Sequence, residues 1–269
     1  MIIDKRILSF LFILFFVGGV QAAEMKKKSI TWLLFDFPGT IDFTAPEGQR
    51  GYLLEIFEIV KEQTPEYEHI VLEMPFVRVL QHMKKKMGTC SLLVLKNEER
   101  AKYISFGEPI FEGVPAGVIS LKDNPRLVKY VDKSKEVDVR LLLADKDLKF
   151  GKVVGRFYGD KISRALEGYQ GQNMIEKRGS NSSKELHQML LSKRIDAFFG
   201  FAVELLEKKE LQFFPVKGNN SHLDPRFSCD NGEYGKEILQ RLENLRRDPS
   251  LKVRFDKIYE RYYFQKAHK

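Results

Sequence analysis

Apolar runs of strand length alternate with amphipathic segments along most of this chain, and this alternation constrains the fold more than any other feature. In the first part, apolar runs stand at 29–35, 68–74 and 89–95. The segments between them, 52–63 and 76–86, repeat apolar residues at helical spacing. Strands that alternate with helices are typical of α/β proteins. The sequence therefore predicts an α/β fold.

The same alternation begins again after the stretch "GEPIFEGVPAG". Further strands are predicted at 116–121, 151–157, 172–178, 195–201, 211–217 and 226–229, and helices at 123–133, 158–169, 182–193, 203–209, 235–248 and 251–263. The sequence thus predicts two βα-rich units in series, joined near 112–115, with a helical tail. Loops at the carboxyl ends of the strands build the ligand crevice in open sheets, so a cleft between the units is the expected ligand site.

The N-terminus has the pattern of a secretory signal peptide. Basic residues at 5 and 6 precede an apolar run over 7–17, and Val20 and Ala22 occupy the two small-residue positions of a cleavage site. The apolar run is short for a membrane span, which needs about 20 residues. The alternative is an uncleaved anchor. We expect cleavage after Ala22, which makes 1–22 the signal peptide and the periplasm the destination.

Charge and motif content exclude several functions. The formal net charge is +8, but the basic residues form no stripe with interleaved aromatic residues, so no nucleic-acid partner is expected. The five histidines are scattered, and the chain contains no HExxH, GxSxG, Walker-type or GxGxxG motif. We therefore expect no enzymatic activity, no cofactor and no metal. The two cysteines, Cys90 and Cys229, match no zinc pattern and form either a disulfide or two buried thiols.

A series of motifs resembles the bacterial extracellular solute-binding proteins of family 3, the type II periplasmic binding proteins best known for polar amino acids. The motifs follow in order from about residue 30 to 265. They are Phe37-Pro38, "GQRGYLLEIFEIV", "MPFVRVLQHMKK", "CSLLVLKNEERAKYISFGEPIF", "VVGRFYGDKISRAL" and "LLSKRIDAFF". The resemblance implies two lobes, each a mostly parallel sheet flanked by helices, with the ligand cleft between them. Lobe one would comprise 24–114 plus 222–269, and lobe two 115–221.

In this arrangement the strand near Cys229 would lie beside the strand bearing Cys90, and the resemblance therefore implies a Cys90–Cys229 disulfide. It also places Arg100 where amino-acid-binding members carry the arginine that grips the α-carboxylate of the ligand. A guanidinium suits this task because its fork matches a carboxylate with two hydrogen bonds. The acid that meets the α-ammonium would fall near Phe201, so that half of the usual site is missing. An anionic, more apolar or aromatic ligand is expected instead.

Other matched positions give further candidates for the ligand site. Phe37 and Phe76 stand where the family places aromatic walls, with core packing as the alternative. Arg78 could add positive charge to the cleft. Tyr158, Gly159 and Asp160 open a predicted helix whose free N–H groups could receive an anion, although helix capping by Asp160 is the simpler interpretation.

We therefore expect an exported, monomeric solute-binding protein that captures a small, carboxylate-bearing ligand for a membrane importer or a sensor. The alternatives are an exported hydrolase and a non-binding interaction module on the same fold. A nucleophile–base pair would favour the hydrolase. A cleft filled by Leu93 and Phe201 would favour the interaction module.

Overall fold

A computed structural model describes residues 27–46, 50–205, 208–220 and 222–267. The predicted signal peptide, 1–22, lies outside the described residues. No helix in the described part of the chain is both long and apolar enough to cross a membrane.

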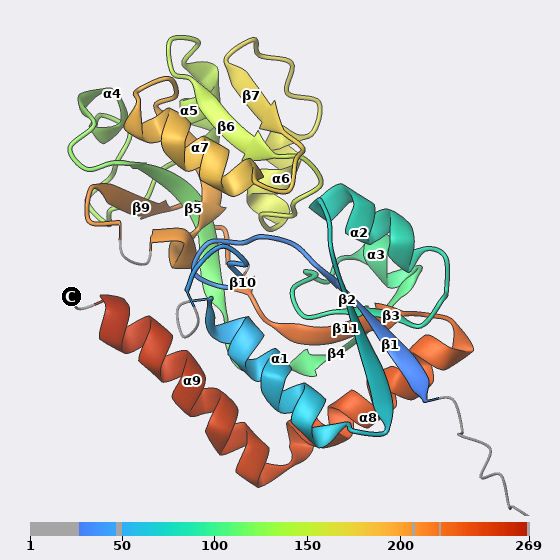
Figure 1. Ribbon diagram of the computed structural model, residues 1–269. Helices are drawn as coiled ribbons and strands as arrows, with labels where there is room; N and C mark the ends of the chain where they lie inside the picture. The colour runs from blue at the N-terminus through green and yellow to red at the C-terminus, as the bar shows by residue number, and fades with distance from the viewer. Residues whose placement is uncertain (1–26, 47–49, 206–207, 221, 268–269) are drawn as a thin grey trace, which may run out of the picture.

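The chain forms two lobes, each built on its own sheet (Figure 1). The first sheet has the strand order β2-β1-β3-β11-β4. Its strands are β1 (Lys28–Leu34), β2 (Tyr67–Glu73), β3 (Thr89–Ser91), β4 (Ile104–Pro109) and β11 (Arg226–Asp230). β1 is parallel to β2 and β3, whereas β11 is antiparallel to both β3 and β4. The late strand β11 thus returns the chain to the first sheet.

The second sheet has the order β10-β5-β8-β6-β7, with β9 also paired to β5. Its strands are β5 (Val114–Leu121), β6 (Phe150–Val153), β7 (Met174–Lys177), β8 (Ala197–Phe201), β9 (Leu211–Pro215) and β10 (His222–Leu223). β6 is parallel to β7 and β8, and β5 is antiparallel to β8, β9 and β10. Each sheet is therefore mixed through a single strand, β11 in the first and β5 in the second, while the other strands run in one direction, as expected of mostly parallel sheets. The strand β10 pairs within the second sheet, although its residues were expected in lobe one.

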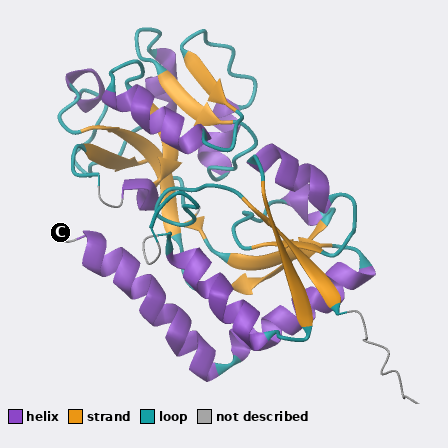
Figure 2. Ribbon diagram, in the orientation of Figure 1, coloured by secondary structure: helices purple, strands orange, loops and turns teal. Residues whose placement is uncertain are grey.

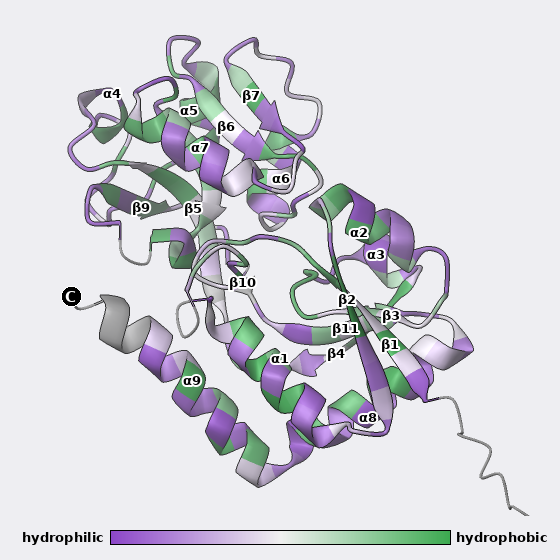
Figure 3. Cartoon of the chain, in the orientation of Figure 1, coloured by the Kyte–Doolittle hydropathy of each residue, from purple (hydrophilic) through white to green (hydrophobic). Residues whose placement is uncertain are grey.

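Helices cover both sheets (Figure 2). The first lobe carries α1 (Tyr52–Gln63), α2 (Phe76–Met83), α3 (Glu98–Ala101), α8 (Glu233–Arg247) and α9 (Pro249–Ala267). The second carries α4 (Pro125–Val128), α5 (Val139–Ala144), α6 (Asp160–Leu166), α7 (Ser182–Leu191) and the 3₁₀ turn η1 (Ala202–Leu205). α9 lies beside α1 and α8. The helices α7 and α9 alternate hydrophobic and hydrophilic residues, as expected for helices with one face on the core (Figure 3). The residues of α1 are mostly buried or half-buried, because α9 and α8 pack against it.

The cores of the two lobes are continuous. One cluster of buried hydrophobic residues extends from Trp32 in the first sheet through Phe37 and Phe201 to Phe150 in the second. A smaller cluster, which includes Leu186 and Phe198, lies under α7. The lobes are thus packed against each other, and the space between them is largely filled.

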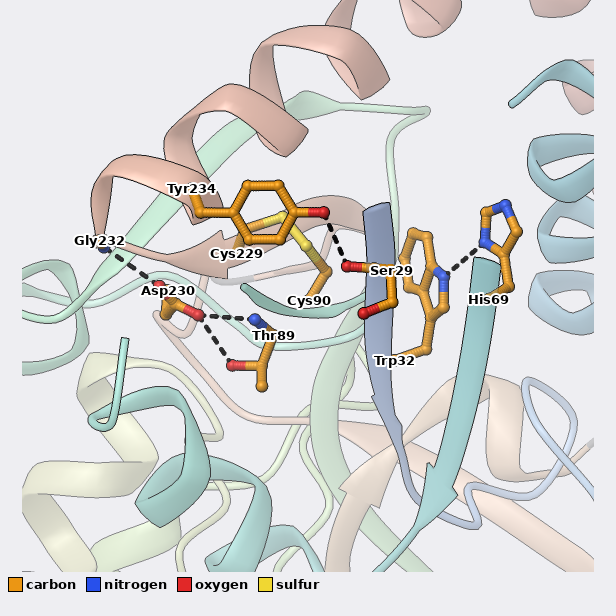
Figure 4. Close-up of a disulfide and its surroundings, with 9 residues drawn as sticks. All are labelled: Ser29, Trp32, His69, Thr89, Cys90, Cys229, Asp230, Gly232 and Tyr234. Carbon is orange, nitrogen blue, oxygen red and sulfur yellow. Dashed lines mark hydrogen bonds between the residues drawn. A yellow bond between two sulfur atoms is a disulfide. The ribbon is translucent and has the colours of Figure 1, made fainter. Parts of the chain in front are cut away.

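The disulfide implied by the resemblance is present. Cys90 of β3 lies directly opposite Cys229 of the antiparallel strand β11, and their sulfur atoms are bonded (Figure 4). Both residues are fully buried. Next to the disulfide, the carboxylate of Asp230 accepts hydrogen bonds from the amide and hydroxyl of Thr89 (Figure 4). These contacts hold β11, from the C-terminal part of the chain, to β3 at the centre of the first sheet.

Two predicted strands are shorter in the structure, and both differences shape the site. The strand expected over 89–95 ends at Ser91, so Leu93 and Leu95 lie in an irregular segment beside the second lobe. The strand expected over 151–157 ends at Val153 because Gly155 has a φ of +82°, which turns the chain. A Cβ at Gly155 would lie 3.2 Å from the side chain of Val77 in the first lobe, so a small residue allows this close approach.

Candidate ligand-binding site

Arg100 is a buried cation that contacts both lobes. It lies in α3, where the side chain of Asn97 caps the helix by accepting a hydrogen bond from the Arg100 amide. Its guanidinium donates to the carbonyl of Leu95 at 2.7 Å and to the carbonyl of Gly155, in the second lobe, at 2.8 Å. The guanidinium also lies 5.3 Å from the ring centroid of Phe76. Only 3% of the residue is exposed, and burial lowers its pKa to about 10.

A small cavity lies between the lobes around this guanidinium, and we call it the interlobe cavity. Its walls are Phe35, Phe37, Phe76, Leu93, Leu95, Arg100, Arg156, Phe157 and Phe201. Its volume of about 20 Å³ has room for roughly one water molecule. The structure therefore shows the lobes closed on each other, with apolar side chains in most of the space between them.

A second buried arginine, Arg156, follows the turn at Gly155. Its guanidinium lies 4.3 Å from the ring centroid of Phe37 in the first lobe. The same group pairs with Glu204 of η1 at 3.3 Å and donates to the hydroxyl of Ser183 at 2.5 Å. Glu204 in turn accepts a hydrogen bond from the amide of Phe201 at 3.1 Å. The side chains of Arg156 and Glu204 are only 6% and 0% exposed, so this is a desolvated ion pair.

Sequence reasoning missed this pair. The acid expected near Phe201 is absent at that position, but Glu204 reaches back to the Phe201 amide from three residues further along the chain. The sequence shows only that Arg156 directly follows Gly155, a glycine near the end of a predicted strand. The role of Arg156 depends on Phe37 and Glu204, which only the fold brings to it.

Another contact between the lobes is made by Lys184 of α7. Its ammonium lies 3.3 Å from Asp36 and 2.9 Å from Asp42, and it donates to the hydroxyl of Thr44 at 2.7 Å. Burial raises the pKa of Asp36 to about 6, although Lys184 beside it acts in the opposite direction. For Lys184, burial lowers the pKa, but Asp42 and Asp36 together raise it above its ordinary value. Desolvation is therefore the dominant effect on Asp36.

The structure brings three of the seven predicted ligand residues together. Arg100, Phe76 and Phe37 all line the interlobe cavity. Arg78 is exposed on α2 and does not line it. The separation follows from helical geometry, because residues two positions apart point in different directions.

The other three predicted residues serve the second lobe rather than the cavity. Tyr158 is buried against Phe201, and its hydroxyl accepts a hydrogen bond from the Val153 amide at 2.9 Å. Gly159, not Asp160, is the N-cap residue of α6, with a φ of +88°. Asp160 is the first residue of that helix, where it is exposed and lies 3.7 Å from Arg164. Across the described ranges, no group of three or more His, Cys, Asp or Glu side chains could hold a metal ion.

The protein has two lobes with mixed sheets, and a strand from the C-terminal part of the chain, β11, returns to the first sheet. This arrangement defines the type II fold of periplasmic binding proteins. Solved structures with this fold match most of this chain and nearly all of their own length. An arginine-binding protein mutant from T. maritima has a TM-score of 0.65 at 16% identity, covering 88% of this chain and 96% of that one. A Streptococcus pneumoniae amino-acid ABC transporter substrate-binding protein, bound to L-arginine, has a TM-score of 0.65 at 14% identity, with coverages of 88% and 93%.

A Salmonella typhimurium periplasmic binding protein with high arginine specificity has a TM-score of 0.63 at 14% identity. The match covers 88% of this chain and 99% of that one. No protein-family model and no curated protein matches the sequence. At these identities the likeness establishes the fold.

Proposed function

We propose that this protein is a periplasmic solute-binding protein that captures a small, carboxylate-bearing ligand between its lobes without a chemical reaction. The observation that supports this most directly is the hydrogen bond from Arg100 to the carbonyl of Gly155, which belongs to the opposite lobe. When the lobes separate, this bond breaks and the donor faces the cleft. A ligand carboxylate would then satisfy the buried guanidinium, which makes charge-assisted hydrogen bonds to such groups.

The walls of the interlobe cavity fit the same ligand class. The Phe76 ring lies 5.3 Å from the Arg100 guanidinium, and Phe37 supplies a second aromatic ring to the cavity wall. The acid of the second lobe, Glu204, is already paired with Arg156. Among the described residues that line the interlobe cavity, Arg100 and Arg156 are charged and none is an acid, and Arg100 has no carboxylate partner. This favours a carboxylate with an apolar body over a zwitterionic amino acid.

Delivery of the ligand is proposed from the fold and the N-terminal sequence. The neighbouring structures include substrate-binding proteins of ABC transporters, which favours a membrane importer as the partner, with a sensor as the alternative. The signal-peptide pattern at 1–22 favours export to the periplasm. Hinge motion would act in a monomer between lobe one, expected over 24–114 plus 222–269, and lobe two, 115–221, with β10 paired to the second sheet.

A thermal-shift screen against amino acids, apolar carboxylates, peptides and muropeptides tests the proposal. A ligand that binds the folded state raises the melting temperature in proportion to the logarithm of its concentration above Kd. Arg100→Ala should abolish the shift. Arg78→Ala is the matched control, because it removes an exposed arginine outside the cavity and should leave the shift intact. A ligand-induced shift that survives Arg100→Ala would refute the role of Arg100.

The small volume of the interlobe cavity favours a second candidate, a non-binding interaction module. Leu93 and Phe201 both line the cavity and leave room for only about one water molecule. A binding protein must open to admit its ligand, whereas an interaction module need not. Small-angle scattering separates the two: a population with separated lobes favours capture, and one closed state at all ligand concentrations favours the module.

A further inference from the structure

The surroundings of Arg156 hold both terminal nitrogens of its guanidinium group, whereas its buried Nε has no hydrogen-bond partner. The ring of Phe37 lies 4.3 Å from the guanidinium carbon, a distance suited to a cation–π contact. The carboxylate of Glu204, which is fully buried, lies 3.3 Å from Nη1, and the hydroxyl of Ser183 accepts from Nη2. One aromatic face, one carboxylate and one hydroxyl therefore meet a single planar cation. We call these three residues the guanidinium subsite.

The position of this subsite is that of a ligand group rather than of an ordinary ion pair. Phe37 comes from the first lobe, whereas Ser183 and Glu204 come from the second, so the guanidinium is enclosed between the lobes. Arg156 also lines the interlobe cavity together with Arg100. An occupant of the subsite therefore contacts both lobes in the closed state, as a captured ligand would.

The residue before Arg156 strengthens this interpretation. The carbonyl of Gly155 accepts the interlobe hydrogen bond of Arg100, the same donor that a ligand carboxylate would use. Two consecutive residues thus supply both halves of a bound ligand, an oxygen acceptor for Arg100 and a guanidinium for Glu204. The positive φ of Gly155 turns the chain out of β6 directly before Arg156 and allows this placement.

We propose that Arg156 is an internal occupant of the guanidinium subsite, and that it determines specificity by excluding ligands that carry a guanidinium group of their own. The proposal rests on the proposed function only in that it treats the space between the lobes as a ligand cleft. It accounts for a closed state whose interlobe cavity holds no more than about one water molecule.

Chemical rescue of Arg156→Ala tests this. The variant leaves the buried carboxylate of Glu204 uncompensated, so its melting temperature should fall below that of the wild type. Methylguanidinium at millimolar concentration should raise the melting temperature of the variant saturably, by roughly 3 °C or more, and should not raise that of the wild type. N-methylurea, a neutral molecule of the same shape, should have no effect on either protein.

Two further variants check the specificity of the rescue. Arg164→Ala removes an exposed arginine of the second lobe and should show no response to methylguanidinium. Arg156→Ala combined with Glu204→Gln should lose the rescue, because the carboxylate that recognises the cation is gone. If Arg156→Ala does not fold alone, recovery of the fold by methylguanidinium supports the proposal, and failure to recover overturns it.

The results also separate this inference from the proposed function. Equal stabilisation by methylguanidinium and N-methylurea, or no stabilisation of the variant, would overturn the guanidinium subsite. Such a result would leave the Arg100-dependent ligand screen unaffected. Conversely, rescue of Arg156→Ala in a protein that binds no carboxylate would uphold the subsite and refute only the proposed ligand class.

Discussion

The ammonium of Lys184 lies 3.3 Å from the buried carboxylate of Asp36 and thereby links the second lobe to the end of β1 in the first. Lys184 also contacts Asp42 at 2.9 Å. Burial nevertheless raises the pKa of Asp36 from 3.8 to about 6. Desolvation therefore destabilises the charged form of Asp36 more than the nearby Lys184 ammonium stabilises it.

This shift predicts a pH dependence of stability. The folded protein retains a proton on Asp36 that the unfolded chain has lost, so stability should fall as the pH rises from about 4 to about 6. Asp36→Asn removes this loss and should raise the free energy of unfolding at pH 8 by about 1–3 kcal/mol. Urea unfolding of both proteins at several pH values measures the difference. Asp160→Asn, at an exposed position, is the control, and an Asp36→Asn variant less stable than wild type at pH 8 would contradict the prediction.

Removing the ammonium of Lys184 should lower the free energy of unfolding, in contrast to Asp36→Asn. Lys184→Met leaves Asp36 without its interlobe partner, so the variant should lose about 1–3 kcal/mol at pH 8. The loss should shrink near pH 5, where Asp36 takes up a proton. Lys129→Met is the matched control, because Lys129 is an exposed lysine that pairs with Asp145 within the second lobe, away from the contact between the lobes. A loss that does not depend on pH would show that Asp36 is not the group involved.

Phe37 joins the lobes by packing, and its removal should open them. Its ring lies 5.7 Å from that of Phe201 and is only 2% exposed. Phe37→Ala should cost about 3–5 kcal/mol and increase the radius of gyration measured by small-angle scattering. Phe57→Ala, which removes a ring packed on Trp32 within the first lobe, should cost a similar amount with no change in radius. Equal radii for the two variants would show that Phe37 does not hold the lobes together.

The disulfide should contribute strongly to stability. It joins residues 139 positions apart and lies between β3 and β11, which hold the C-terminal part of the chain to the first sheet. The double variant Cys90→Ala/Cys229→Ala should lose about 3–5 kcal/mol in guanidinium chloride unfolding, because the unfolded chain is no longer restricted. Reductant should lower the stability of the wild type and have no effect on the variant. Unchanged stability of the wild type in reductant would contradict this.

The single tryptophan provides a probe of the first sheet. The indole of Trp32 donates to Nδ1 of His69 at 2.9 Å, and this bond requires a neutral imidazole (Figure 4). Burial lowers the pKa of His69, so the unfolded chain takes up the proton first and stability should fall as the pH drops below about 6.5. His69→Gln, which keeps an acceptor, should weaken this dependence. Tryptophan fluorescence during urea unfolding measures it, and identical pH profiles would exclude His69 as its source.

Much of the fold could be predicted from local patterns. The helix predicted over 52–63 coincides with α1, because apolar residues at helical spacing define one buried face wherever the helix packs. The predicted strands 29–35 and 195–201 lie within one or two residues of the bounds of β1 and β8, because short apolar runs mark buried strands. The motif that placed Arg100 also led to a residue that lines the interlobe cavity. Motif position thus selected one arginine among 45 basic residues.

The sequence by itself determined the alternation of strands and helices, and its resemblance to a known family implied the pairing of Cys90 with Cys229. Only the tertiary structure decided what fills the space between the lobes. Arg156 meets Phe37, and Lys184 meets Asp42 across 142 positions of sequence, because the lobes close on each other. Periodicity and capping act within a few residues, whereas desolvation and ion pairing depend on which distant side chains the closed fold brings into contact.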